Sequence, residues 1–169
     1  MRSMQPIEEV RYLILAAQRE GNRFLAEALQ PLGLTPSQAE VLRVLQDWQP
    51  LALIELGSLL VCEQGSPSRL VAGLVASGHI AREPSPEDKR KVVLTLTTRG
   101  RAAAIQVETI ESALYSALSA QVSTQHVEAM KHALWQIVRG LPAGDALARR
   151  MQQAQRPPGA GDTDTTPVS

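Results

Sequence analysis

The chain has 169 residues, a length that predicts one domain with an appended element. Its 17 basic and 17 acidic side chains cancel, which excludes a polybasic, histone-like binder but not a local charged patch. Ala and Leu contribute 22 residues each and only five residues are aromatic, a composition that favours helices over strands. The single cysteine excludes an intramolecular disulfide. No apolar run approaches the roughly 18 residues of a membrane span, so we expect a soluble, cytoplasmic protein.

The first half of the chain predicts four helices. Residues 7–30 show the spacing of a long amphipathic helix, which ends at Pro31-Leu32-Gly33. Thr35-Pro36-Ser37-Gln38 is typical of a helix start, with an N-cap, a first-turn proline and a capping-box glutamine, and this second helix ends near Trp48. Two short helices follow over residues 54–62 and 66–77, and they are joined by a tight turn.

The second half predicts a hairpin between helices. Strands over residues 79–83 and 91–97 flank a polar, turn-rich segment, which indicates a β-hairpin with a long tip. Long amphipathic helices follow over residues 98–119 and 124–139, then a short helix over 145–155. Residues 157–169 are small, polar and Pro-bearing, so we expect disorder there.

The order of these elements predicts a fold class that is mostly α with a small β-hairpin (α+β). Two short helices joined by a tight turn satisfy the helix-turn-helix layout, whose second helix enters the major groove of DNA because that groove admits a helix. The hairpin that follows is placed as a wing that reaches a neighbouring minor groove. We therefore expect a winged helix-turn-helix at residues 35–100, flanked by dimerisation helices at 1–34 and 101–141, with a short helix and tail at 142–169.

These segments resemble the MarR family of winged-helix transcription regulators over residues 8–141. The most specific part is PEDKRKVVLTLTTRG at residues 86–100, which is similar to the family's wing signature of Asp-x-Arg followed by L-x-L-T-x-x-G. LTPSQ at residues 34–38 and SRLV at 68–71, followed by Leu74 and Gly78, add to the resemblance. The resemblance implies a homodimeric repressor that binds a pseudo-palindromic operator in double-stranded DNA.

The predicted wing carries an excess of positive charge, with six basic and three acidic residues between positions 82 and 101. Arg90 has a permanently charged planar group that suits a narrow, negative minor groove, and Asp88 is placed to hold it by a charge-assisted hydrogen bond. The resemblance assigns the minor-groove contact to Arg90. The alternative is a solvated tip with an ordinary surface ion pair. The predicted DNA-binding residues are Ser66, Ser68, Arg69, Asp88, Lys89, Arg90 and Lys91.

The predicted recognition helix is sparse in polar side chains. Ser66 fits a DNA contact and a helix N-cap equally well. Arg69 is the sole basic residue between positions 64 and 78, and Ala72 and Gly73 stand where many relatives carry polar residues. We therefore expect DNA shape and phosphate contacts to carry more of the affinity than base readout. The alternative function is a degenerate winged-helix dimer that acts as a protein-interaction module without specific DNA recognition.

The helices at both ends carry more apolar surface than a small winged-helix core can cover. The resemblance implies that they interlock in a homodimer, which would space two recognition helices about one DNA turn apart. Packing within one subunit is the alternative. The candidate interface residues are Val10, Leu13, Leu134, Trp135, Ile137 and Leu141.

The resemblance also implies a small aromatic or phenolic effector. It would bind in a crevice between the dimerisation helices and the DNA-binding domain at residues 35–100, which we call the reading domain. Such a ligand releases the DNA because it binds more tightly to a dimer whose two recognition helices have a spacing that does not fit the operator. The candidate ligand residues on the first helix are Tyr12, Arg19 and Arg23.

We expect neither an enzyme nor a cofactor or metal site, because the chain has no HExxH, P-loop or GxGxxG motif. Glu108 and Glu111 share a helix face that we interpret as solvated rather than as a paired-carboxylate site. Cys62 is open to two interpretations, a peroxide sensor or a structural thiol. The structural role is favoured, because the family's sensors place their thiol in the first helix, where this chain has none.

Overall fold

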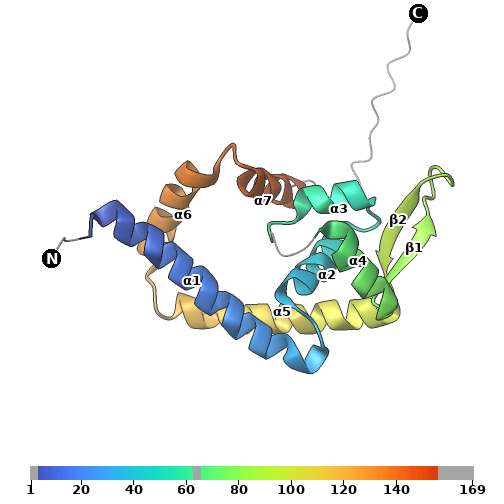
Figure 1. Ribbon diagram of the computed structural model, residues 1–169, viewed down its shortest axis with the longest axis horizontal. Helices are drawn as coiled ribbons and strands as arrows, with labels where there is room; N and C mark the ends of the chain where they lie inside the picture. Colours follow the sequence, from blue (N-terminus) through green and yellow to red (C-terminus); the bar gives the residue numbers. More distant parts are fainter. Residues whose placement is uncertain (1–3, 63–65, 156–169) are drawn as a thin grey trace, which may run out of the picture.

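The computed structural model describes residues 4–62 and 66–155 of the chain (Figure 1). Within these ranges the winged helix-turn-helix is present in the predicted order, so the predicted fold class is confirmed. The tail at residues 157–169, which we predicted to be disordered, lies outside the described residues. The elements are α1 (Pro6–Leu29), a 3-10 turn η1 (Gln30–Leu32), α2 (Pro36–Trp48), α3 (Leu53–Leu59), α4 (Pro67–Ala76), β1 (Ile80–Pro84), β2 (Val92–Leu96), α5 (Thr98–Ser119), α6 (Thr124–Val138) and α7 (Pro142–Ala154).

Side-chain caps set several helix starts. The capping box at α2 is formed as the sequence predicts: the Gln38 amide donates to Thr35 Oγ1 at 3.2 Å, and the Thr35 amide donates to Gln38 Oε1 at 3.0 Å. Thr97 caps α5 in the same way, accepting the Gly100 amide at 3.0 Å. These caps satisfy amide groups that have no partner within the helix.

The wing is a two-stranded antiparallel hairpin, in which Ile80 pairs with Leu96 and Pro84 with Val92. Its strands end within one residue of the predicted bounds. Leu51 adds a short bridge on the outer side of β2, exchanging two backbone hydrogen bonds with Leu94 at 2.8 and 3.3 Å. This bridge ties the hairpin to the segment that leads into α3.

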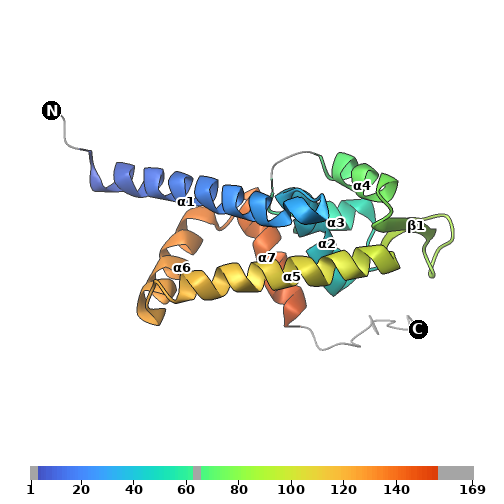
Figure 2. The ribbon, with the colours of Figure 1, turned by 90° about the horizontal axis from the view of Figure 1, so that it is seen from below.

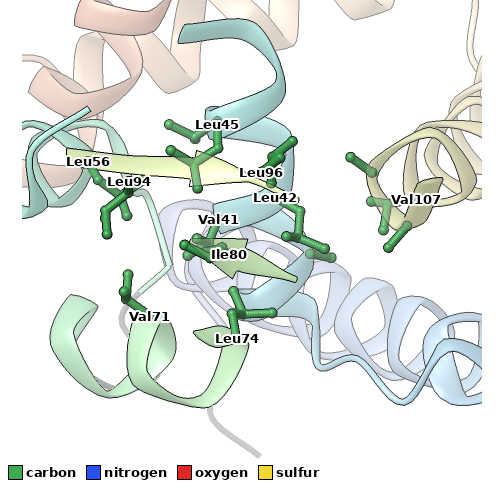
Figure 3. Close-up of a cluster of buried hydrophobic side chains, with 14 of the residues drawn as sticks. Val41, Leu42, Leu45, Leu56, Val71, Leu74, Ile80, Leu94, Leu96 and Val107 are labelled. Carbon is green, nitrogen blue, oxygen red and sulfur yellow. The ribbon is translucent and has the colours of Figure 1, made fainter. Parts of the chain in front are cut away.

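The hydrophobic core lies where α2, α3, α4, α5 and the hairpin meet (Figure 3). Leu42 and Leu45 of α2 contribute fully buried side chains, as do Leu56 of α3 and Leu74 of α4. Ile80 and Leu96 close the core from the hairpin. The core therefore fixes α4 and the wing relative to one another.

Two helix bounds differ from the prediction, each for an identifiable reason. α3 ends at Leu59 and not at Cys62, because the amides of Val61 and Cys62 donate to the Glu40 carboxylate instead of continuing the helix. α7 begins at Pro142, three residues before the predicted start, with the proline in its first turn, where a missing amide hydrogen has no cost.

The terminal helices extend away from the wing. In both ribbon views the N-terminal half of α1 and the whole of α6 lie at the end of the molecule opposite the hairpin (Figures 1 and 2). Within the described ranges, no helix combines the length and apolar character that crossing a membrane requires.

Gly100 in the first turn of α5 lies against the backbone that enters the wing. A Cβ built there would sit 2.0 Å from the His79 carbonyl oxygen. Gly100→Ala is therefore expected to lower the free energy of unfolding by about 1–3 kcal/mol or more, because the backbone must shift to accept the methyl group. Urea unfolding measures this change.

The matched control is Gly21→Ala in α1, where an added Cβ meets nothing within 4 Å. This change is expected to raise stability by about 0.5–1 kcal/mol, since alanine is the better helix former. Equal effects of the two changes would contradict the close approach at Gly100.

Candidate DNA-binding surface

α4 presents one face to the core and the other to solvent. Val71 and Leu74 are buried, whereas Ser68, Arg69 and Ala72 are exposed on the outer face. Ser66 is the N-cap: its Oγ accepts the Arg69 amide at 3.4 Å and lies 3.0 Å from Ser68 Oγ. The structure therefore confirms the capping role of Ser66.

The wing tip is held in one shape by its own polar groups. Asp88 Oδ1 accepts the Arg90 backbone amide at 3.1 Å and Arg90 Nε at 3.3 Å, the contact that the sequence predicts. The Arg90 side chain is 93% exposed. An ion pair this exposed adds at most about 1 kcal/mol to stability. The main effect of the ion pair is therefore to orient the exposed guanidinium group of Arg90 at the tip of the hairpin.

Ser85 is a tip residue that sequence reasoning missed. It is buried at the base of the tip, where its amide donates to the Lys91 carbonyl at 2.8 Å and its Oγ accepts the Glu87 amide at 3.3 Å. The available signal was a serine between Pro84 and Pro86, because serine hydroxyls commonly bind nearby backbone groups in turns.

Of the predicted wing residues, the structure brings Lys89 next to α4. Val71 of α4 and Lys89 of the tip line the same shallow groove between α3, α4 and the hairpin. Lys89, Arg90 and Lys91 are all exposed, so the basic charge of the wing faces solvent. The groove is lined by Leu53, Val71, Arg82, Glu83, Pro84, Lys89, Val92 and Leu94.

The predicted interface residues lie on surfaces that the single chain leaves open. Val10 and Leu13 of α1 are exposed, and so are Leu134 and Ile137 of α6, while Trp135 is half-buried. Leu141, the N-cap residue of α7, is also exposed. None of the six side chains is fully buried by the described part of its own chain. Their place in an interface between two subunits stays a prediction.

The predicted ligand residues do not lie in a crevice beside the reading domain. Tyr12, Arg19 and Arg23 line a depression whose described walls all belong to α1. The Arg11 guanidinium lies over the Tyr12 ring, 5.1 Å from its centroid, and Arg23 pairs with Glu20 at 2.6 Å. These walls alone do not form the predicted crevice between α1 and the reading domain, so the ligand site stays a prediction.

Comparison with known proteins agrees with this geometry. A MarR family model matches residues 34–92. Multiple antibiotic resistance protein MarR from Escherichia coli K12 is 29% identical over 127 residues, covering 75% of this chain and 88% of that protein. A crystal structure of a mutant of that MarR complexed with operator DNA has a TM-score of 0.69 and 27% identity, covering 82% of this chain and 99% of the other. These matches support a MarR-family winged-helix regulator.

Further relatives match a shorter stretch of the chain or are less similar in sequence. MarR from Salmonella typhimurium is 33% identical over 90 residues, covering 53% of this chain and 62% of that protein. BpsR from Bordetella bronchiseptica, solved in a study of the regulation of its DNA binding by 6-hydroxynicotinic acid, has a TM-score of 0.70 at 21% identity. The likeness to BpsR shows the fold alone.

The interpretation of Glu108 and Glu111 as a solvated face holds for Glu108, which is 49% exposed, and is wrong for Glu111, which is 19% exposed; both bind Arg43. Arg43 of α2 lies 3.3 Å from Glu108 and 3.2 Å from Glu111, and Gln46 donates to Glu108 at 3.1 Å. Burial raises the pKa of Glu111, and the Arg43 charge opposes that rise. These contacts fasten α5 to α2.

Cys62 is half-buried beside the Glu40 carboxylate. Burial and the hydrogen bond to that carboxylate raise the pKa of the thiol from 9.0 to about 11. At pH 8 the thiolate, which is the reactive form, is therefore on the order of a hundredfold scarcer than in an ordinary cysteine. This environment favours the structural interpretation over a peroxide sensor.

Alkylation of Cys62 by iodoacetamide is accordingly expected to be about a hundredfold slower at pH 8 than that of a cysteine in a short peptide. The rate should keep rising with pH beyond 10, where the peptide has reached its plateau. Mass spectrometry of the native protein measures both rates, and the peptide is the control. A plateau below pH 9 would contradict the raised pKa.

Proposed function

We propose that this chain is a sequence-specific double-stranded-DNA-binding transcription regulator, and that it acts as a homodimeric repressor released by a small aromatic or phenolic ligand. The observation that carries the proposal is the wing tip, where Asp88 binds the almost fully exposed Arg90 side chain. The related MarR from E. coli, solved in complex with operator DNA, supports it.

In this proposal α4 enters the major groove and the wing reaches the adjacent minor groove. Ser68 and Arg69 face outward in the first turn of α4, where base edges and phosphates lie in such complexes. Ser66 would add a phosphate contact while it caps the helix. Asp88, Lys89, Arg90 and Lys91 form the minor-groove contact, with Arg90 the inserted side chain.

The exposure of α6 supports a second copy in this proposal. This helix has 15 residues and no buried one, although Leu134 and Ile137 lie on one side of it. A helix of that length is marginal in water without tertiary packing. A homodimer covers this apolar side together with Val10 and Leu13 of α1, and Trp135 and Leu141 complete the interface. In this proposal residues 1–34 and 101–141 form the dimerisation regions and residues 35–100 form the reading domain. Residues 142–169 are an appended segment.

Ligand release also depends on the second copy. Tyr12, Arg19 and Arg23 share one side of α1, and α1 alone cannot enclose a small molecule. In the proposed dimer the partner subunit closes this depression. An aromatic effector would stack on Tyr12 and pair its anionic group with the two arginines, shifting the dimer to a spacing that does not fit the operator.

The alternative, a protein-interaction dimer without specific DNA recognition, is favoured by one observation. The exposed face of α4 beyond its first turn carries the small residues Ala72, Gly73 and Ala76, which offer no hydrogen bonds to base edges. A salt titration of binding to the DNA upstream of the chain's own gene separates the two functions. Random DNA of equal length and composition is the control.

A regulator is expected to bind the upstream DNA with a nanomolar-range Kd and to prefer it over random DNA by at least about 10³-fold. The logarithm of its affinity should also fall steeply with the logarithm of salt concentration, since several phosphates are neutralised. Equal affinity for both DNAs would reject specific recognition and support the interaction module.

A further inference from the structure

The last described helix, α7, binds the helix-turn-helix through two arginines. Arg150 Nε donates to the Leu59 carbonyl at 2.6 Å, and Arg149 Nη1 donates to the Ser58 carbonyl at 3.0 Å. Both carbonyls belong to the end of α3, where a helix leaves its carbonyl groups without internal partners. A second nitrogen of Arg150 pairs with the carboxylate of Glu40 in α2.

That same carboxylate holds the backbone that follows α3. Glu40 Oε1 accepts the Val61 amide at 2.8 Å, and Oε2 accepts the Cys62 amide at 2.9 Å. The two residues precede α4 in the chain, and α3 itself packs against α4. Glu40 therefore sets both where α3 ends and in which direction the backbone leaves it.

The Arg150–Glu40 pair is sheltered from water. The two side chains are 22% and 17% exposed, so their attraction is screened less than that of a surface pair. Burial would raise the pKa of Glu40, but the hydrogen bonds from Cys62 and Val61 and the charge of Arg150 outweigh it. The pKa lies below its ordinary value, and the carboxylate is charged at neutral pH.

α7 is also fixed at its other end. Gly144 lies so close to α6 that a Cβ there would be 2.0 Å from the Val138 carbonyl oxygen, and Ala146 is buried. The helix thus spans from the end of α6, which the proposed function places in the dimer interface, to the end of α3 in the reading domain. Figure 1 shows α7 in this position between α6 and α3.

We propose that Arg150 is a positioning residue for DNA recognition, which fixes the backbone of Val61 and Cys62 at the end of α3 through Glu40 and thereby, since α3 packs against α4, links the dimerisation helices to the orientation of α4. The inference rests on the proposed function. In this role Arg150 does not contact DNA. Its removal should therefore affect DNA binding differently from the removal of Arg69 or Arg90, which contact DNA in the proposed function.

Arg150→Met tests the link, because methionine keeps the apolar stem and removes the guanidinium group. We expect operator affinity to fall about tenfold, with random-DNA affinity and the salt slope unchanged, since no phosphate contact is lost. The matched control is Arg139→Met. Arg139 is exposed at the end of α6, and its side chain makes no hydrogen bond or ion pair with the described residues. That variant should bind operator within about twofold of the unaltered protein.

Amide hydrogen exchange supplies a readout that needs no DNA. The Val61 and Cys62 amides should exchange at least about tenfold faster in Arg150→Met, while amides in the middle of α5 keep their rates. Arg150→Lys keeps the charge but not the planar group, and we expect it to restore part of the operator affinity. A double-mutant cycle combines Arg150→Met with Glu40→Gln. The fold-loss of operator affinity in the double variant should be smaller than the product of the two single fold-losses, because both side chains belong to one network.

Two results overturn the inference. One is operator binding by Arg150→Met that equals that of the unaltered protein. The other is an equal loss of operator and random-DNA affinity, which indicates a charge effect or general unfolding. If the unaltered protein itself shows no preference for operator, the proposed function fails. Amide exchange in Arg150→Met then tests the positioning network by itself: unchanged rates at Val61 and Cys62 reject the network as well.

Discussion

Replacing both Leu134 and Ile137 of α6 with aspartate is expected to convert the protein to monomers and to abolish high-affinity operator binding. Each of these side chains is about half exposed in the single chain, so covering the rest of one contributes about half of the roughly 1.5–3 kcal/mol of full burial. The homodimer loses four such side chains, two from each subunit, which weakens association by roughly 10²–10⁴-fold, and the buried carboxylates add to the loss. A monomer reads one half-site only. Sedimentation equilibrium and operator titration measure the two effects.

The matched control is His132→Asp with Gln136→Asp, which adds two carboxylates to the opposite side of the same helix. Both positions are exposed, and we expect this variant to remain dimeric and to bind operator as before. A dimer that persists in the Leu134 and Ile137 variant would place the interface elsewhere.

Arg90→Ala is expected to weaken operator binding by about 1–3 kcal/mol, or roughly 5–150-fold, and to leave the dimer intact. The side chain is 93% exposed and makes its ion pair only with Asp88 among the described residues, so its removal costs the fold almost nothing. Fluorescence anisotropy with labelled operator measures the loss. Arg139→Ala removes the same charge at the end of α6 and serves as the control.

Asp88→Asn separates the position of the Arg90 guanidinium group from its charge. This change removes the carboxylate that accepts two hydrogen bonds from Arg90 and makes the tip more basic. We expect random-DNA binding to strengthen and the preference for operator to shrink.

Unchanged operator affinity in Arg90→Ala would show that the wing tip does not contact DNA.

The sequence was most informative where structure depends on near neighbours. The capping box at Thr35 and Gln38 predicts the start of α2, and alternation of apolar residues predicts the hairpin within one residue. The contact between Asp88 and Arg90 spans two positions, so composition and turn geometry suffice to predict it. The local geometry of the wing tip was predictable for this reason, and its contact with DNA stays a prediction.

Contacts between distant parts of the chain were not predictable. Arg43 binds Glu111 across 68 positions, and Arg150 binds Glu40 across 110. Nothing in the local pattern of either arginine distinguishes it from a surface residue, because its partner is brought close only by the packing of helices. The ligand site at Tyr12 stays a prediction for a related reason: the surroundings of α1 depend on surfaces far from it in the chain.

The end of α3 has a consequence for protein engineering. Because α3 stops where Glu40 accepts the next two amides, the helix-turn-helix is not a self-contained cassette. A chimera that received only residues 53–76 would lack the side chains that define the exit of α3, and the transplanted α4 would enter its new scaffold at an altered angle. Transferring Glu40 and Arg150 with the segment, at equivalent positions on the recipient's helices, is the minimum for a graft that keeps its DNA preference.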